Sequence, residues 1–181
     1  VKRNFRKPLI VMSPKSLLRH PRATSMIGDI AKGKFEEILQ DTLIADPSKV
    51  EKVVLVSGKF YYELLEQREK SNDIKTALVR LEQIAPFPDW KLKEVLQVYK
   101  NAKKIVWAQE EPQNMGAFSY VFFKLNDFIN QAQAKVSISY VCRPDRASPA
   151  TGSIYRHKQE QAELIEKVFK AQRDKLERGS K

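Results

Sequence analysis

Short apolar runs alternate along this chain with segments whose apolar residues recur at helical spacing. The clearest run is KVVLVSG at residues 52–58, which is rich in β-branched residues and ends at Gly58. Tyr61, Leu64 and Leu65 follow it at the spacing of an amphipathic helix. Strands that alternate with helices are typical of βαβ units, in which helices cover both faces of a mostly parallel sheet. The alternation therefore predicts an α/β protein with three layers, α/β/α.

The other elements are predicted by the same two periodicities and by turn residues. The predicted strands lie at 8–12, 35–39, 52–58, 76–84, 104–109 and 136–141, with 35–39 at an edge. The predicted helices follow Ser13 and Pro14, Gly58, Asp89, Gly116 and the loop at 143–153. The sequence contains no internal repeat and no linker long enough to divide it. We expect one α/β domain at residues 7–170, between a flexible segment at 1–6 and a frayed basic tail at 171–181.

Composition limits the classes of partner. The chain has 181 residues, of which 42% are apolar and 30% charged, as in ordinary globular proteins. Its net charge of +11 raises the question of nucleic acid, but the basic residues are scattered and aromatic residues do not alternate with them. No apolar stretch approaches the roughly 20 residues that a membrane span needs. We expect neither a nucleic-acid nor a membrane partner, and the single cysteine, Cys142, favours a reducing compartment.

Polar residues follow the predicted strands at the end where α/β proteins bind ligands. They are Lys15 and Arg19, then Lys59, then Gln109, Glu110 and Glu111, and finally Arg143 and Arg146. Because the carboxyl ends of parallel strands meet at one edge, these residues should form a basic rim that contains two carboxylates. Two interpretations stay open. The rim binds an anion or faces an acidic partner, or Glu110 and Glu111 pair with Arg143 or Lys59 and only hold the loops.

The residues alone predict no catalytic group and no metal ligand. His20 and His157 are the only histidines, and neither belongs to a cluster with metal-ligand spacing. Glu110 and Glu111 are adjacent, so in an extended strand they point in different directions and make a poor acid–base pair. Arg143 could lower the pKa of the neighbouring Cys142, but no partner histidine is evident and an inert thiol is expected.

Five longer segments carry a resemblance to a known family. They are KPLIVMSPKSLLRHP at 7–21, SGKFYYELLEQR at 57–68, ALVRLEQIAPFP at 77–88, WAQEEPQNMGAF at 107–118 and RPDRASPATG at 143–152. In this order they resemble the C-terminal domain of 2-oxoglutarate dehydrogenase, the thiamine-diphosphate-dependent first component of a multienzyme complex. The resemblance implies a transketolase C-terminal-like fold with a five-stranded, mostly parallel sheet.

The resemblance also implies what the whole enzyme does. Such an enzyme decarboxylates 2-oxoglutarate in the tricarboxylic acid cycle and transfers the succinyl group to a lipoyl domain of the succinyltransferase component. In the family, thiamine diphosphate and Mg²⁺ bind to the two preceding domains, so this chain is expected to bind neither and to be inactive alone. The family implies a homodimer in the bacterial cytoplasm or the mitochondrial matrix, of which we prefer the cytoplasm. The related 2-oxoadipate dehydrogenase is the alternative within the family.

Some members of the family bind acetyl-CoA or AMP on this domain as a regulator. The positions that match the rim of such a site are Arg19, Lys59, Gln109 and Arg143, which the strand-end argument also selects. Glu110 and Glu111 are expected to be structural or interface groups. A stand-alone module that binds CoA or an adenine nucleotide is the alternative from a different functional class.

Overall fold

The computed structural model describes residues 4–132 and 136–170. Contacts within the chain divide it into two units, residues 1–34 and residues 35–181. The expected basic tail at 171–181 and the first three residues of the expected flexible segment lie outside the described residues. The domain boundaries at residues 7 and 170 therefore stay predictions.

The first unit contains two short helices and an exposed apolar segment. The helix expected after Ser13 and Pro14 is a 3₁₀ helix, η1 (Lys15–Arg19), and a six-residue helix, α1 (Ile27–Lys32), follows. The strand predicted at 8–12 is wrong, since these residues are extended without a strand partner among the described residues. Leu9 and Met12 are 86% and 91% exposed. A β-branched apolar run predicts that a segment can pair and be buried, but a strand forms only where another strand accepts its hydrogen bonds.

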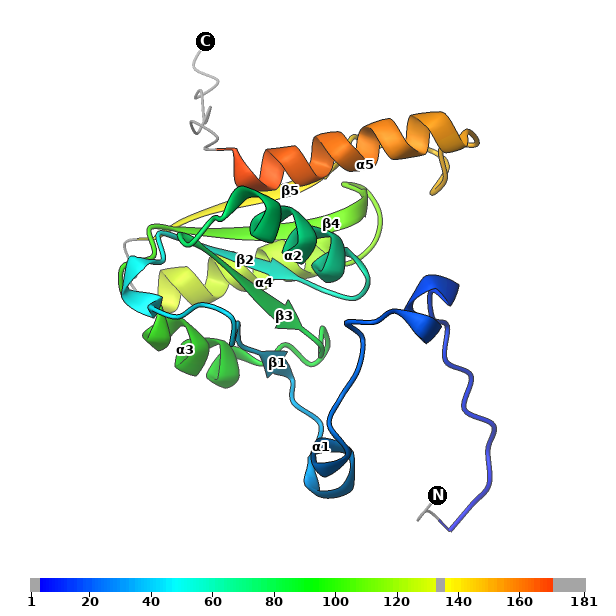
Figure 1. Cartoon of the computed structure of the whole chain (residues 1–181), viewed down its shortest axis with the longest axis horizontal. Helices are drawn as coiled ribbons and strands as arrows, with labels where there is room; N and C mark the ends of the chain where they lie inside the picture. Colours follow the sequence, from blue (N-terminus) through cyan, green and yellow to red (C-terminus); the bar gives the residue numbers. More distant parts are fainter. Residues whose placement is uncertain (1–3, 133–135, 171–181) are drawn as a thin grey trace. The chain divides into compact units, whose positions relative to one another are not determined.

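The second unit is built on one five-stranded sheet (Figure 1). The strands are β1 (Ile38–Leu39), β2 (Lys52–Val56), β3 (Thr76–Leu81), β4 (Lys104–Pro112) and β5 (Ser137–Arg143), in the spatial order β1-β3-β2-β4-β5. Strands β2 to β5 all run parallel to one another, and β1 pairs antiparallel with β3 at one edge. The prediction of a five-stranded, mostly parallel sheet is confirmed, and the edge strand predicted at 35–39 is present only as the two residues of β1.

Helices cover both faces of the sheet (Figure 1). They are α2 (Phe60–Ser71), α3 (Asp89–Val98), α4 (Phe118–Ala132) and α5 (Ile154–Phe169), with a 3₁₀ turn, η2 (Pro47–Lys49), before β2. One core cluster joins alternate strand residues such as Leu55 and Trp107 to Leu92 of α3 and Leu125 of α4. The other joins the intervening strand residues to α2 and α5. Because side chains alternate across a strand, the two clusters define two faces, and the predicted three layers are confirmed.

A buried ion pair fastens the stretch that follows β1 to the rest of the sheet. The Asp41 carboxylate accepts hydrogen bonds from the Arg68 guanidinium of α2, and also from the backbone N–H of Leu78 in β3 at 2.8 Å. The side chains of Asp41 and Arg68 are 0% and 6% exposed. One carboxylate thus joins a loop, a helix and a strand.

Candidate functional site

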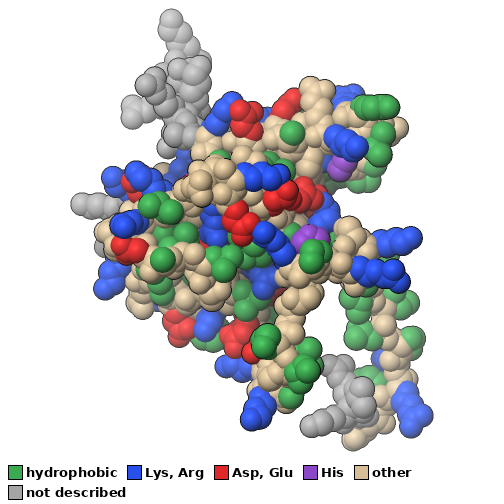
Figure 2. Space-filling model, viewed as in Figure 1, with side chains coloured by type: hydrophobic (Ala, Val, Ile, Leu, Met, Phe, Trp, Pro, Cys, Tyr) green, Lys and Arg blue, Asp and Glu red, His purple; other side chains and the backbone are tan. Residues whose placement is uncertain are grey.

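The carboxyl ends of β2, β4 and β5 bring four of the predicted polar residues to one edge of the sheet. Lys59 stands at the start of α2, just after β2, and Arg143 is the last residue of β5. Gln109 and Glu110 lie in the last part of β4. Figure 2 shows that acidic and basic side chains are interspersed over the region of α2 and α5, instead of forming a field of one sign.

A continuous hydrogen-bonded network joins Lys59 to Arg143. Lys59 Nζ lies 3.0 Å from a Glu110 oxygen and also contacts the Glu63 carboxylate one helical turn further along α2. Gln161 of α5 donates to Glu63 at 2.7 Å and to Glu110 at 3.1 Å, and its carbonyl oxygen accepts from Arg143 at 2.5 Å. We call these five residues the strand-end network. Within it, the Glu110 carboxylate is paired with the Lys59 ammonium group.

The neighbouring carboxylates of the network change the pKa of Lys59. Partial burial lowers the pKa of its ammonium group, but the hydrogen bonds and the attraction of Glu63 and Glu110 outweigh this effect. The net result is a raised pKa, so Lys59 stays a cation at neutral pH and the two carboxylates stay its partners.

Arg143 is buried but incompletely paired. Its residue exposure is 5%, and besides Gln161 it lies 3.3 Å from His157 Nδ1 and 3.7 Å from a Glu160 oxygen. Arg143 Nε and Glu160 Oε2 are buried and have no hydrogen-bond partner within the part of the chain that the structure describes. Since a buried N–H without a partner costs about 1–3 kcal/mol, Arg143 keeps an unused capacity to donate.

A cavity of about 430 Å³ opens beside the network. It is lined by Lys59, Glu110, Glu111, Arg143 and His157, and by residues 149–154 of the loop that leads into α5. Ser153 is the N-cap residue of α5, and its side chain makes no capping hydrogen bond. The first N–H groups of a helix carry partial positive charge and bind anions. Two cations and a helix N-terminus therefore face a cavity that also has two carboxylates on its wall.

Gln109 lies on the opposite face of the sheet from this cavity. Its amide oxygen accepts from Trp107 Nε1 at 3.0 Å, and Trp107 belongs to the core under α3 and α4. Its amide nitrogen donates to the carbonyl oxygens of Pro112 at 3.0 Å and Met115 at 2.8 Å. The Gln109 amide thus holds the turn after β4, whereas its neighbour Glu110 points into the strand-end network.

Of the four residues predicted for an anion site, the structure brings Lys59 and Arg143 to one cavity. Gln109 is separated from them by the sheet, and Arg19 is the last residue of η1 in the first unit. For these two residues, a part in the anion site stays a prediction. Glu111 lines the cavity and is exposed, but Glu110 alone of the two carboxylates joins the network.

Sequence reasoning missed the residues that α2 and α5 contribute. Glu63 follows Lys59 by four residues, and Gln161 follows His157 by four, so each pair lies on one helix face. This spacing could have placed Glu63 beside Lys59. Nothing in the sequence indicates that Gln161, 98 residues from Glu63, bridges the two helices.

Gly116 fits closely against the Gln109 amide, which gives the first prediction. It has a φ of +65°, and a Cβ there would lie 3.1 Å from Gln109 Nε2 and 3.2 Å from Oε1. Gly152 has a similar φ of +69° with nothing within 4 Å of the Cβ position. Both Gly→Ala changes cost backbone energy, of about 1–2 kcal/mol. Gly116→Ala should cost about 1–3 kcal/mol more than Gly152→Ala, because it also overpacks the turn.

Urea unfolding of the two glycine variants measures this difference directly. If both variants lose the same free energy of unfolding, the turn held by Gln109 accommodates the added methyl group without a penalty. The turn would then not hold the end of β4.

The comparisons with known proteins agree with the resemblance seen in the sequence, and the family match includes four of the five segments, all but 7–21. A family described as 2-oxoglutarate dehydrogenase C-terminal matches residues 24–169. The chain belongs to this family. The 2-oxoglutarate dehydrogenase E1 component of Cupriavidus necator is 42% identical over 167 residues, which make up 92% of this chain and 17% of that protein. The E1 component of Haemophilus influenzae is 41% identical over 164 residues, with 91% and 17% covered.

The chain is similar to the C-terminal region of the E1 component, and it spans about 17% of the length of these relatives. Among solved structures, one described as "Split gene transketolase, inactive beta4 tetramer" is similar with a TM-score of 0.49 and 15% identity, over 74% of this chain and 43% of that one. None of the helices in the described residues is long and apolar enough to cross a membrane.

Proposed function

We propose that this chain is the C-terminal part of an enzyme that decarboxylates 2-oxoglutarate and passes the succinyl group to the lipoyl domain of a succinyltransferase component. Membership of the 2-oxoglutarate dehydrogenase C-terminal family and the two named E1 relatives support this proposal. The bacterial origin of both relatives favours a cytoplasmic enzyme. 2-Oxoadipate dehydrogenase is the alternative, since this chain carries no residue that we assign to substrate choice.

Thiamine diphosphate and Mg²⁺ would supply the decarboxylation chemistry of that enzyme. Residues 4–132 and 136–170 contain no group of three or more His, Cys, Asp or Glu side chains that could hold a metal ion. In the family that the sequence resembles, the cofactor binds to the two preceding domains, so we assign no catalytic residue to this chain. The purified chain should release no CO₂ from 2-oxoglutarate with both cofactors added, and release by the chain alone would overturn this division.

Within that enzyme we propose two roles for this domain, homodimer assembly and the binding of acetyl-CoA or AMP in the strand-end cavity. The observation that carries the second role is Arg143, whose Nε is buried beside the N-terminus of α5 and has no hydrogen-bond partner among the residues that the structure describes. Phosphate oxygens suit this arrangement, because guanidinium groups bind them with paired hydrogen bonds and helix N–H groups add to the attraction. In this role Arg143 and Lys59 contact the phosphate, and Gln161 positions Arg143.

The Glu110 carboxylate competes with the ligand for Lys59, so ligand binding should change the contact between Glu110 and Lys59. A phosphate that reaches Lys59 competes with the Glu110 carboxylate, which lies 3.0 Å from the ammonium nitrogen. Ligand binding would therefore loosen the link between the end of β4 and the start of α2, and pass a signal into the sheet edge.

Calorimetry with acetyl-CoA and with AMP tests the site. Arg143→Ala and Lys59→Ala should each weaken binding at least about tenfold, since a hydrogen bond to a charged group contributes about 1.5–3 kcal/mol. Lys158→Ala is the matched control, because Lys158 is an exposed cation of α5, the helix whose N-terminus lines the cavity, and does not itself line the cavity.

Arg143→Lys separates charge from geometry and guards against a folding defect in Arg143→Ala. It keeps the positive charge but cannot make the paired bonds, so its affinity should fall between those of the wild type and Arg143→Ala. Absence of heat with both ligands, or an equal loss in Lys158→Ala, would leave only the assembly role. Sedimentation of the chain tests that role separately.

A further inference from the structure

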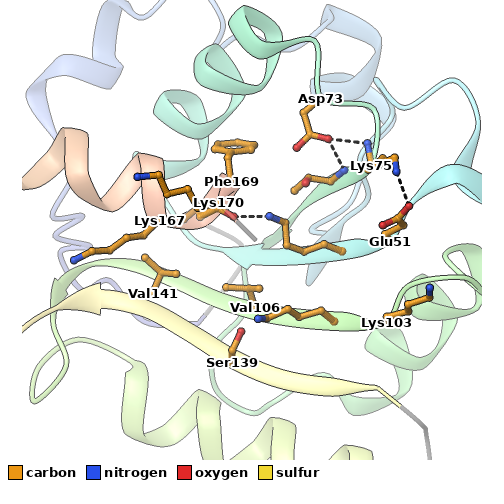
Figure 3. Close-up of a pocket in the computed structure, with 14 residues that line it drawn as sticks. Glu51, Asp73, Lys75, Lys103, Val106, Ser139, Val141, Lys167, Phe169 and Lys170 are labelled. Carbon is orange, nitrogen blue, oxygen red and sulfur yellow. Dashed lines mark hydrogen bonds and ion pairs between the residues drawn. The ribbon is translucent and has the colours of Figure 1, made fainter. Parts of the chain in front are cut away.

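A second cavity lies at the opposite end of the same sheet, where strands β2, β4 and β5 begin (Figure 3). Its volume is about 330 Å³, within the range of small-molecule sites. Cations dominate its lining, with six lysines and two carboxylates, among apolar and hydroxyl groups. The lysines are Lys52, Lys75, Lys103, Lys104, Lys167 and Lys170.

Two of the lysines stand directly opposite each other on neighbouring strands. Lys52 of β2 pairs in register with Lys104 of β4. Both residues alternate with core residues of the α2 and α5 face, such as Val54 and Val106, so they share that face. Like charges directly opposite one another destabilise a sheet. Burial lowers the pKa of Lys52, and repulsion by Lys104 adds to this effect against the attraction of Asp73.

The two carboxylates of the cavity bind residues at the start of β3, which line it as well. Glu51 forms an ion pair with Lys75 at 2.8 Å, and the Asp73 carboxylate accepts from the backbone N–H groups of Lys75 and Thr76 at 2.8 and 3.1 Å (Figure 3). Lys52 forms no ion pair with a carboxylate within the described residues, and donates instead to the Val168 carbonyl oxygen at 2.6 Å.

The contact with Val168 explains why a lysine stands at position 52, but it does not explain the rest of the cavity. Lysine side chains often bind the last carbonyl groups of a helix, and Val168 lies in the last turn of α5. This role requires neither Lys104 beside Lys52 nor a hydroxyl group on the next strand.

That hydroxyl group belongs to Ser139 of β5, which pairs in register with Val106 of β4. Its Oγ is buried and has no hydrogen-bond partner among the described residues. Figure 3 shows it directed into the cavity from below. The Phe169 ring, with its centroid 5.8 Å from Lys52 Nζ, and the side chain of Val141 add apolar surface. Buried polar atoms in proteins normally have partners, so this one calls for a ligand group.

We propose that this cavity is a second anion site, which binds a small organic anion through a carboxylate or phosphate group. Lys52, Lys104 and Ser139 hold the charged group, and the apolar body of the ligand lies against Val141 and Phe169. The negative charge of the ligand then offsets the repulsion between the two lysines, which pair in register on β2 and β4, and the Ser139 hydroxyl gains its partner. The site is independent of the strand-end cavity and of the ligand proposed there.

Residue-resolved NMR titration of the 181-residue chain tests the proposal with three probes, benzoate, phenyl phosphate and inorganic phosphate. The amides of Val106, Ser139 and Val168 should shift with saturation, and those of residues 149–154 in the other cavity report separately. Benzoate against phenyl phosphate distinguishes carboxylate from phosphate recognition. Phenyl phosphate should bind more tightly than inorganic phosphate, because only the former has a body that contacts Phe169.

Two variants and a control test whether the amide shifts come from binding of the probe in this cavity. Ser139→Ala should weaken binding about fivefold and Lys104→Gln about tenfold, as expected for one neutral and one charged hydrogen bond. Neither variant touches the Lys52 contact with α5, so both should fold normally. Lys93→Gln removes the same charge from an exposed position of α3 and should leave the affinity unchanged. The proposal is overturned if no probe shifts the three amides at millimolar concentration, or if all three variants bind alike.

Discussion

Asp41→Ala should lower the free energy of unfolding by about 3–5 kcal/mol, the loss found when one partner of a buried ion pair is removed. The change leaves the Arg68 guanidinium buried without its carboxylate, and it also deprives the Leu78 N–H of its acceptor. Both groups lose a partner that water cannot replace, because the Asp41 side chain is wholly buried. Urea unfolding followed by circular dichroism gives the free energy.

The double variant Asp41→Leu with Arg68→Met is the decisive control. It removes both charges together, so no charge is left buried alone, and it should recover a large part of the stability that Asp41→Ala loses. Asp46→Ala serves as the matched single change, since Asp46 is a half-exposed aspartate that caps η2, and its loss should cost only about 1 kcal/mol. A loss in Asp41→Ala no larger than in Asp46→Ala would contradict a structural role for the buried pair.

The parallel part of the sheet was predictable because local sequence and tertiary structure agree there. The run at 52–58 is β-branched, bounded by a glycine and long enough for one strand, and it became β2 at the centre of the sheet. A central strand is buried on both faces, so it shows as continuous apolar sequence and not as alternation. The neighbouring strands carry the same signal.

The run at 8–12 is also apolar and contains β-branched residues, but it is exposed, so apolar composition alone did not predict whether a strand forms. Apolar β-branched residues indicate that a segment can be buried in a sheet, but they do not identify the partner strand. The described residues offer none to this run. Exposed apolar residues gathered in one segment are typical of interaction surfaces, so we expect residues 8–12 to pack against another domain or another copy of the chain.

The candidate site was predicted in part, and the limit is again physical. The rule that ligands bind at the carboxyl ends of parallel strands selected Lys59 and Arg143, which the structure brings to one cavity. The rule does not specify which face of the sheet a side chain occupies. It therefore also selected Gln109, whose amide lies with Trp107 on the face of the sheet opposite the cavity. Alternation predicts that Gln109 and Glu110 point to opposite faces, but only the packing of α2 and α5 decides which face holds Lys59.

Cys142 should react with a disulfide reagent about a thousandfold more slowly in the folded chain than in the denatured chain at pH 8. Burial, with a smaller contribution from the Asp145 charge, raises the pKa of the thiol from 9.0 to about 12. The thiolate is the reacting species, and three pH units correspond to about a thousandfold less of it. This result would agree with the inert thiol expected from the sequence, in spite of Arg143 next to it.

The pH dependence of the reaction distinguishes a raised pKa from simple shielding of the sulfur. In the folded chain the rate should continue to rise about tenfold for each pH unit between pH 8 and 10, because the thiol is still far below its pKa. In guanidinium the rate should level off near the ordinary pKa. Asp145→Asn should accelerate the folded chain only modestly, since burial is the larger cause. A folded rate that levels off at the same pH as the denatured one would mean that access, and not protonation, protects Cys142. The thiol would then become reactive once a partner or motion exposed it, and a redox role for the end of β5 would have to be considered.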